Sequence, residues 1–116
     1  MDNWKDYFAE GKEIILATSS KEGKPNANIV ISLGIVDGKY VLIADCQMDT
    51  TIKNLKENPY ACLVGGYFRI KGGAEIFTSG KYFDVCVKKS EGYEVKHAIL
   101  VQIEEVFDLD KVIKLT

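Results

Sequence analysis

Few side chains in this sequence could carry out chemistry on their own. The chain has one histidine, His97, and its three cysteines are widely spaced, at Cys46, Cys62 and Cys86, so that none forms a CxxC pair. A zinc site would therefore lack the closely spaced ligands that such sites usually take from one segment. The motifs of serine hydrolases, HExxH zinc enzymes and P-loop nucleotide-binding proteins are also missing. A redox or group-transfer reaction would need a bound cofactor to carry the chemistry.

These residues also have structural interpretations that require no chemistry. Cys62 lies in an apolar run and Cys86 on the apolar face of a predicted helix, so we expect both thiols to be buried and reduced. His97 directly precedes the apolar segment 98–101. A single histidine in such a place more often forms a hydrogen bond at the end of a strand than it binds a ligand. The sequence therefore predicts no catalytic residue and no metal ligand.

Length, charge and hydropathy limit the kinds of protein that this can be. The chain has 116 residues, of which 47% are hydrophobic and 28% charged, as expected for one domain spanning residues 1–116. With 15 basic and 17 acidic residues the net charge is −2. The chain therefore lacks the overall positive charge that attracts a protein to nucleic acid or to anionic membranes. No apolar run approaches the roughly 20 residues that span a bilayer, and the N-terminus has no signal-peptide core. We expect a soluble cytoplasmic protein.

The pattern along the chain is mostly that of β-strands. Alternating or continuously apolar runs predict six strands, at residues 14–19, 26–36, 40–45, 60–64, 67–78 and 98–107. Apolar spacings of three and four residues predict three short helices, at residues 2–10, 51–58 and 80–90. Asp2 is the expected cap of the first helix, and residues 108–116 form a mixed tail. Asp37-Gly38 indicates a hairpin, and Gly72-Gly73 inside a strand indicates a bulge or a sharp corner.

Six strands and short helices in a chain of this length predict a small, mostly antiparallel β-barrel. Three strands are apolar at consecutive rather than alternating positions, at residues 29–31, 40–43 and 98–101. Strands of this kind need apolar cover on both faces. The barrel interior covers one face, and the short helices are too small to cover the rest, so we expect a second copy of the chain to do so. The pattern predicts a homodimer.

Three stretches of the sequence are similar to those of one known family. The first covers residues 16–30 and contains Gly23-Lys24-Pro25, the second covers residues 37–59 and ends in Asn58-Pro59, and the third covers residues 68–75. In this order and spacing, over residues 12–107, the chain resembles the FMN-binding split β-barrels related to pyridoxamine 5′-phosphate oxidase, especially their short single-domain members. The resemblance implies a mostly-β fold, a six-stranded antiparallel split β-barrel with short flanking helices, which forms a homodimer.

The resemblance also implies a cofactor and the residues that would hold it. Members of the family bind two FMN molecules per dimer in clefts between the subunits, so this chain is expected to be an FMN-binding flavoprotein and a small flavin-dependent oxidoreductase. Its small-molecule substrate or electron acceptor is not identified. Residues of the second strand would line the flavin ring through backbone groups, residues after the third strand would follow the ribityl chain or the pyrimidine edge, and the start of helix 51–58 would meet the phosphate. In that order these residues are Asn28, Ile29 and Val30; Asp45, Cys46 and Gln47; and Thr50 and Thr51.

The phosphate contact has a physical basis beside the resemblance. A helix N-terminus presents unpaired backbone N–H groups and the positive end of a dipole, although Thr50 and Thr51 could also be ordinary capping residues. Family members often carry a lysine or arginine near this turn, where this chain has threonines flanked by the acidic residue Asp49. A cation is needed from elsewhere. The candidates are Lys53, Arg69 and Lys71, each of which could instead belong to a solvated charged surface.

Other interpretations stay open at this point. One aromatic residue among Trp4, Tyr67 and Phe68 could contact the flavin ring, or all three could belong to the core or to dimer contacts. The protein could also be a non-catalytic dimeric barrel that binds haem, another anionic ligand or a protein partner, with His97 as the one histidine available for haem. Pyridoxamine 5′-phosphate oxidase activity itself is disfavoured, because that enzyme holds a second phosphate with several basic residues and this chain has a single arginine.

Overall fold

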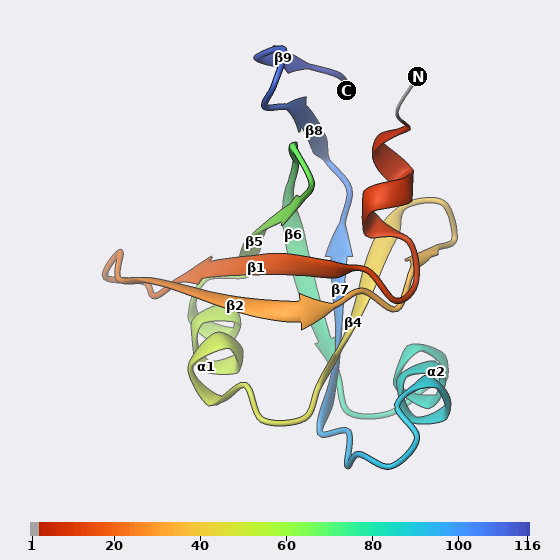
Figure 1. The fold of residues 1–116 in the computed structure, drawn as a ribbon. Helices are drawn as coiled ribbons and strands as arrows, with labels where there is room; N and C mark the ends of the chain where they lie inside the picture. The colour runs from red at the N-terminus through yellow and green to blue at the C-terminus, as the bar shows by residue number, and fades with distance from the viewer. Residues whose placement is uncertain (1–2) are drawn as a thin grey trace.

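The structure, a computed structural model, describes residues 3–116 as one curled antiparallel sheet with two α-helices against it (Figure 1). The mostly-β architecture predicted from the sequence is confirmed. In chain order the elements are the 3₁₀-helix η1 (Trp4–Phe8), β1 (Glu13–Ser19), β2 (Pro25–Ile31), β3 (Ile35–Val36), β4 (Tyr40–Asp45), α1 (Asp49–Glu57), β5 (Tyr60–Gly65), β6 (Phe68–Phe77), α2 (Lys81–Lys89), β7 (His97–Gln102), β8 (Glu105–Asp108) and β9 (Ile113–Lys114).

Strand β6 joins the two halves of the sheet. The strand order is β2-β1-β5-β6-β7-β4-β3, and β6 pairs with β8 through residues 68–71 but with β7 through residues 74–77. The change of partner falls at Gly72 and Gly73. A side chain on Gly72 would place its Cβ 1.7 Å from the carbonyl oxygen of Gln102 in β7, so only glycine allows this approach. The corner predicted at these glycines is confirmed.

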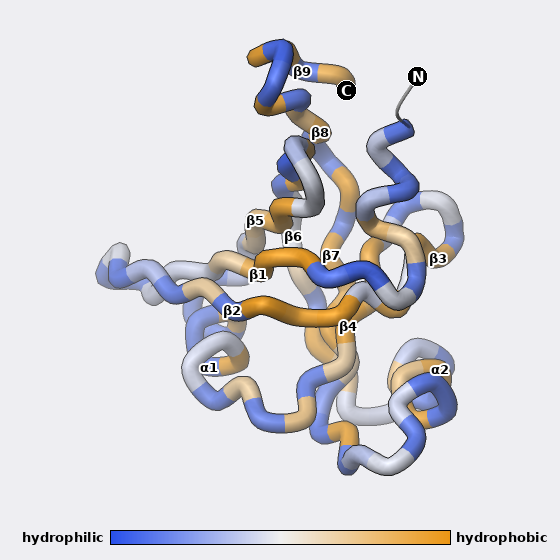
Figure 2. The backbone as a smooth tube through the Cα atoms, viewed as in Figure 1, coloured by the Kyte–Doolittle hydropathy of each residue, from blue (hydrophilic) through white to orange (hydrophobic). Residues whose placement is uncertain are grey.

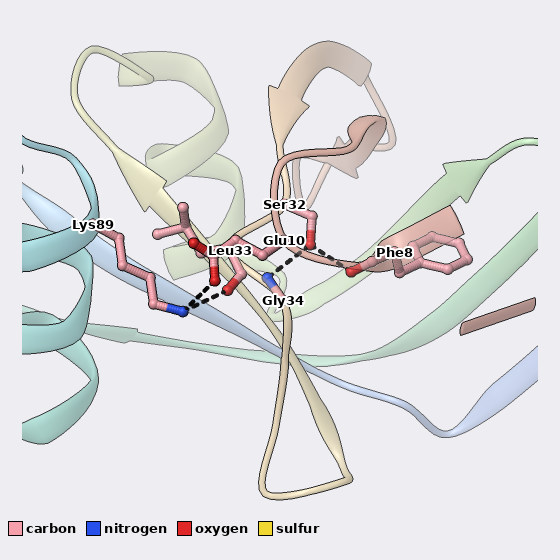
Figure 3. Close-up of polar contacts among 6 residues, drawn as sticks. All are labelled: Phe8, Glu10, Ser32, Leu33, Gly34 and Lys89. Atoms are coloured by element: carbon pink, nitrogen blue, oxygen red, sulfur yellow. Dashed lines mark hydrogen bonds and ion pairs between the residues drawn. The ribbon is translucent and has the colours of Figure 1, made fainter. Parts of the chain in front are cut away.

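Residues 26–36 do not form the single strand that the sequence predicts. Strand β2 ends at Ile31, and β3 pairs with β4 in the other half of the sheet. Between the two strands the buried Ser32 hydroxyl donates to the Phe8 carbonyl oxygen (2.7 Å) and accepts from the Gly34 N–H (3.0 Å), and Gly34 has a φ of +106° (Figure 3). These bonds turn the chain out of one strand and into the next, which an apolar pattern alone does not reveal.

The predicted strand 98–107 also divides in two. Strand β7 ends at Gln102 and β8 begins at Glu105, because the two strands pair with different halves of β6. The C-terminal segment, predicted as a mixed tail, adds the short strand β9 beside β8. The sheet formed by the described residues therefore has nine strands rather than six.

The three predicted helices are present at their expected positions. The first is a 3₁₀-helix capped by Asn3, whose side chain accepts from the Lys5 N–H, while the predicted cap Asp2 lies outside the described residues. Helix α1 packs Ile52 and Leu55 into the core inside the β1–β5–β6 half of the sheet. Helix α2 covers β4 and β7 and places Cys86 in a second core, where its predicted burial is confirmed. Neither α-helix of the described chain has the length and hydropathy needed to cross a membrane.

Candidate functional site

A groove of about 440 Å³ lies where the open edge of β2, the end of β4 and the C-terminal part of α2 meet. Its walls are mostly apolar. It brings together Ile29, Val30 and Cys46, three of the residues that the sequence predicts at a cofactor site. The lining residues are Ile29, Val30, Ile31, Leu33, Ala44, Cys46, Met48, Lys89, Ser90 and Tyr93.

Strand β2 offers free backbone hydrogen-bonding groups along one side of this groove. It is the first strand in the sheet order, so among the described strands it pairs with β1 alone. The Ser32 N–H donates to the Lys12 carbonyl (2.8 Å), and at the other end of the hairpin the Ser20 N–H donates to the Lys24 carbonyl (2.9 Å). Even-numbered residues of β2 therefore direct their backbone groups toward β1, and by the alternation of an antiparallel ladder Ile29 directs its own toward the open edge.

The opposite wall is fixed by the buried Asp45 carboxylate at the end of β4. Its Oδ1 accepts from the Met48 N–H (2.5 Å), and its Oδ2 lies 2.6 Å from Nδ1 of His97, the paired residue on β7. Asp45 therefore sets the course of residues 46–48, which present Cys46 and Met48 to the groove. Both oxygens of the carboxylate have partners within the protein, so any contribution of Asp45 to ligand binding is through this loop. Gln47 is exposed and does not line the groove.

The start of α1 is linked to β2 by a cluster of polar side chains. The Thr51 hydroxyl donates to Oδ1 of Asn28, which also accepts from the Asn26 side-chain amide (3.1 Å). Thr51 is buried by this contact, whereas Thr50 and Lys53 are exposed. The first-turn N–H groups of α1 have no acceptors within the helix, and the helix has no side-chain cap. The fold thus joins two predicted site segments that are far apart in the sequence.

Arg69 and Lys71 lie on the other side of the sheet from this cluster. Arg69 pairs with Val64 of β5 and Phe107 of β8, and directly paired residues share one face. That face is opposite to the core face that α1 covers. Lys71 lines a second groove, of about 390 Å³, near the C-terminal end of α1. Because β6 is three strands from β2, about 14 Å away, neither cation reaches the first groove within one chain.

Lys89 is a groove residue that the sequence did not single out. Its Nζ donates to Oε1 of Glu10 (2.6 Å) and to the Leu33 carbonyl oxygen (3.4 Å), so it ties α2 to the segment after β2 (Figure 3). The Lys88-Lys89 pair at the end of the predicted helix was visible in the sequence, but which lysine faces the groove depends on how α2 packs.

The aromatic residue at the groove also differs from the sequence-based candidates. Phe68 is buried beside Tyr7, with ring centroids 5.4 Å apart, and Trp4 packs against Phe8 and the first core. Tyr67 is exposed in the turn between β5 and β6, outside the groove lining. Tyr93, from the loop after α2, lines the groove instead and is largely exposed.

The titratable groups near the groove do not form a catalytic set. Burial raises the pKa of the Cys86 thiol to about 11, and burial together with Asp45 raises the pKa of Cys46. Burial also raises the pKa of Cys62, which lines the second groove, against the opposing effect of Arg69. All three thiols are therefore protonated at neutral pH and are poor nucleophiles. Within residues 3–116 no group of three or more His, Cys, Asp or Glu side chains could hold a metal ion.

Comparison with known proteins places this chain in a family. The family model for pyridoxamine 5'-phosphate oxidase matches residues 1–115. The uncharacterized protein MJ0282 of Methanocaldococcus jannaschii is 30% identical over 111 residues, covering 86% of this chain and 74% of its own length.

Solved structures with the same fold have different binding properties. HupZ of Group A Streptococcus matches with a TM-score of 0.87 and 22% identity over 100% of both chains. An FMN-binding protein from Syntrophomonas wolfei matches with a TM-score of 0.71 and 15% identity, over 89% of this chain and 76% of its own. The haem storage protein HutZ of Vibrio cholerae matches with a TM-score of 0.62 and 16% identity, over 90% of each chain. These likenesses show the split-barrel fold.

Proposed function

The chain belongs to the pyridoxamine 5′-phosphate oxidase family, and from this we propose that it binds FMN in the groove between β2, β4 and α2. We further propose that it acts as a flavin-dependent oxidoreductase on a small molecule. The observation that carries the proposal is the open edge of β2, where the backbone groups of Ile29 face a groove with apolar walls.

The groove suits the ring of a flavin. The pyrimidine edge of the ring alternates hydrogen-bond donors and acceptors, which the N–H and C=O groups of an unpaired strand edge can match. The apolar side chains of Val30, Ala44 and Met48 would cover the rest of the ring and exclude water. Bound flavin supplies hydride and electron transfer, which the side chains of this chain cannot supply. The protein's part is to orient the ring and keep one edge open to the substrate.

The start of α1 suits the phosphate. Its first-turn N–H groups are free of intrahelical partners, and the exposed Thr50 hydroxyl adds a donor beside them. Lys53 follows one turn later on the same helix and is exposed. The negative charge of Asp49, in the same first turn, would repel the phosphate dianion. The chain's own residues therefore give this end of the groove little net positive charge.

We propose that the functional unit is a homodimer and that the outer face of β1 and β2 forms its interface. Ile15, Ile29 and Ile31 are 41%, 74% and 48% exposed, and Ile15 lies directly opposite Ile29 in the hairpin register. The paired middle parts of both strands stand out as hydrophobic in Figure 2. An exposed apolar patch of this kind on a sheet supports association with a second copy. The groove would then lie at the rim of the interface, because Ile29 and Ile31 border both.

We also propose a cytoplasmic location. Cys46, Cys62 and Cys86 are all free thiols. Free thiols are typical of a reducing compartment.

Purification of the untagged protein tests the flavin proposal. We expect a yellow protein that releases FMN on denaturation, and apoprotein that quenches the fluorescence of added FMN. The variant Cys46→Trp fills the groove and should abolish quenching, whereas Val87→Trp places the same side chain on the exposed side of α2 and should not. Colourless protein that fails to bind added FMN would contradict the proposal. Turnover of NADH or NADPH with nitro or quinone acceptors separates an enzyme from a flavin carrier.

The contact between Asp45 and His97 favours haem binding as a second candidate function. A buried carboxylate that holds Nδ1 leaves Nε2 as the free nitrogen, which is how metal-ligating histidines are commonly oriented. Titration with haem, followed by its visible spectrum, tests this candidate. A haem spectrum that is unchanged in His97→Ala would exclude His97 as the ligand, while haem binding that displaces FMN would identify the two as competitors for one site.

A further inference from the structure

Lys89 is the one charged residue among the ten described residues that line the groove between β2, β4 and α2. Most of the other lining side chains are apolar. In such surroundings an ion is costly to bury unless a free partner of opposite charge is present. The contacts that Lys89 makes within the chain therefore bear directly on the charge of the molecule that the groove accepts.

The charge of Lys89 is already balanced by Glu10. The Lys89 Nζ donates to Oε1 of Glu10 (2.6 Å) and to the Leu33 carbonyl oxygen (3.4 Å), so two of its three donor positions are used within the chain (Figure 3). An ion pair this close presents little net charge to the groove. Among the lining residues an entering anion finds no free cation, and an entering cation finds no carboxylate.

The turn that carries Glu10 is anchored to the segment that follows β2. The Gly11 N–H donates to the Ser32 carbonyl oxygen (2.8 Å), and the Ser32 hydroxyl donates to the Phe8 carbonyl oxygen (2.7 Å). These bonds hold the backbone on both sides of Glu10. The ion pair therefore joins two anchored parts of the fold, the turn after η1 and the C-terminal end of α2.

Tyr93 adds an aromatic surface at the same end of the groove. The Tyr93 N–H donates to the Ser90 carbonyl oxygen (3.0 Å), the Lys96 N–H donates to the Asp45 carbonyl oxygen (2.8 Å), and Val95 between them is buried. The Tyr93 ring is nevertheless 74% exposed, so the fold anchors its loop without covering the ring. An exposed aromatic ring beside apolar walls is suited to stack on a planar molecule.

We propose that the α2 end of the groove binds an uncharged, planar aromatic substrate, and that Glu10 sets this preference by neutralising Lys89. The inference rests on the proposed function and adds a substrate class to it. The flavin ring takes the side of the groove along β2, and the substrate takes the side along α2, against Tyr93. An anion of the same shape has to break the ion pair or leave its own charge without a partner.

Two probes of the same shape separate charge from fit. Naphthalene-2-carboxamide is uncharged, whereas naphthalene-2-carboxylate carries one negative charge at neutral pH on the same ring system. Titration of the FMN-loaded protein, followed by flavin absorbance and by calorimetry, gives a dissociation constant for each probe. We expect the wild-type protein to bind the carboxamide at least about 10-fold more tightly, because the carboxylate loses water without gaining a free cation.

Glu10→Gln tests whether the ion pair sets this preference. Glutamine keeps an oxygen that can accept from Lys89 but removes the negative charge, so the ammonium group stays in place with its charge uncompensated. We expect the affinity for the carboxylate to rise about 10-fold and the affinity for the carboxamide to change by less than about twofold. The gain should disappear in the double variant Glu10→Gln/Lys89→Met.

Glu91→Gln is the matched control for charge. It removes the same charge from an exposed residue directly after Ser90 and leaves the pair of Lys89 and Glu10 intact. We expect neither probe to change its affinity by more than about twofold, because the attraction depends on a nearby unpaired ammonium group and not on the overall charge.

Tyr93→Leu tests the aromatic contact. Both probes should bind about 3- to 10-fold more weakly, because stacking does not depend on their charge, and Tyr93→Phe should keep the wild-type affinities. Tyr60→Leu removes a tyrosine of similar exposure from the second groove and serves as the control. Thermal unfolding shows that each variant is folded.

Four results would contradict the inference and leave the proposed function intact. These are equal binding of the two probes by FMN-loaded wild-type protein, binding of neither probe, no gain for the carboxylate in Glu10→Gln, and the same gain in Glu91→Gln. Unchanged affinities in Tyr93→Leu would overturn the aromatic contact. A wild-type protein that binds no FMN would overturn the proposed function and this inference with it.

Discussion

Asp45 and His97 form a polar pair across strands β4 and β7, with Oδ2 of the carboxylate 2.6 Å from Nδ1 of the imidazole. The other carboxylate oxygen accepts from the Met48 N–H at 2.5 Å. One buried side chain thus fixes both the strand pair and the loop that presents Cys46 and Met48 to the groove. The shape of the groove therefore depends on a residue that is not itself part of the groove lining.

Removal of this carboxylate should loosen the loop and weaken the protein. We expect Asp45→Ala to lower the free energy of unfolding by about 3 kcal/mol, because two hydrogen bonds to a charged group are lost and the Met48 N–H is left without its acceptor. Asp45→Asn keeps an acceptor for the Met48 N–H, so its free energy of unfolding should fall by less than that of Asp45→Ala. Urea unfolding measures both. Equal stabilities of the two variants would show that the Met48 contact contributes little.

The corner of β6 should tolerate a methyl group at one glycine and not at its neighbour. Gly72→Ala places Cβ 1.7 Å from the Gln102 carbonyl oxygen, a backbone atom that cannot move without separating β6 from β7. We expect the free energy of unfolding to fall by more than about 3 kcal/mol, or the variant not to fold. In Gly73→Ala the atom nearest to the added Cβ belongs to the flexible Glu104 carboxylate, at 3.3 Å. The free energy of unfolding should therefore change by no more than about 1 kcal/mol. Thermal unfolding of the two variants gives the comparison, and similar melting temperatures would contradict the assigned close approach.

The Ser32 hydroxyl should be needed for the break between β2 and β3. Ser32→Ala removes one bond to the Phe8 carbonyl and one from the Gly34 N–H, both in buried surroundings. We expect the free energy of unfolding to fall by about 2 kcal/mol and the Gly34 amide to exchange its hydrogen faster. The control is Ser79→Ala, at an exposed position, with an expected effect within about 0.5 kcal/mol. An unchanged exchange rate at Gly34 would mean that another group holds this turn.

The buried thiol of Cys86 should make the protein less stable at high pH. Burial raises its pKa to about 11 from an ordinary value of 9.0. Below pH 9 the thiol is protonated in both states, whereas between pH 9 and 11 the unfolded chain releases its proton and the folded chain keeps it. Unfolding is therefore favoured as the pH rises through this range. Between pH 9 and 11 the free energy of unfolding of the wild-type protein should fall by up to about 2 kcal/mol more than that of Cys86→Ala.

Urea unfolding of both proteins at pH 8, 10 and 11 measures this difference. The alanine variant carries a constant packing loss, so the change with pH and not the offset is the relevant quantity. A difference that stays constant across the series would show that Cys86 titrates normally in the folded protein.

Local patterns were sufficient for the parts of this fold that depend on near neighbours in sequence. The first hairpin, helix α1 and the corner at Gly72-Gly73 follow from turn residues, apolar spacing and the absence of a side chain, and the structure has them where they were predicted. The motifs in 16–30 and 37–59 also identified the family. Strand breaks at Ser32 and after Gln102 were missed, because they arise from pairing with distant strands and from hydrogen bonds to distant residues.

The residue pattern was enough to establish the mostly-β composition, the family, and two of the segments that line the groove, in β2 and directly after β4. The direction in which the predicted site residues face follows from how the chain packs. Asp45 turns inward to His97, Thr51 is buried against Asn28, and Arg69 lies on the outer face of the sheet. These directions are set by strand register and helix packing, which depend on residues far apart in the sequence. A shift of one residue would reverse the side chains on a strand and would turn those on a helix by about 100°.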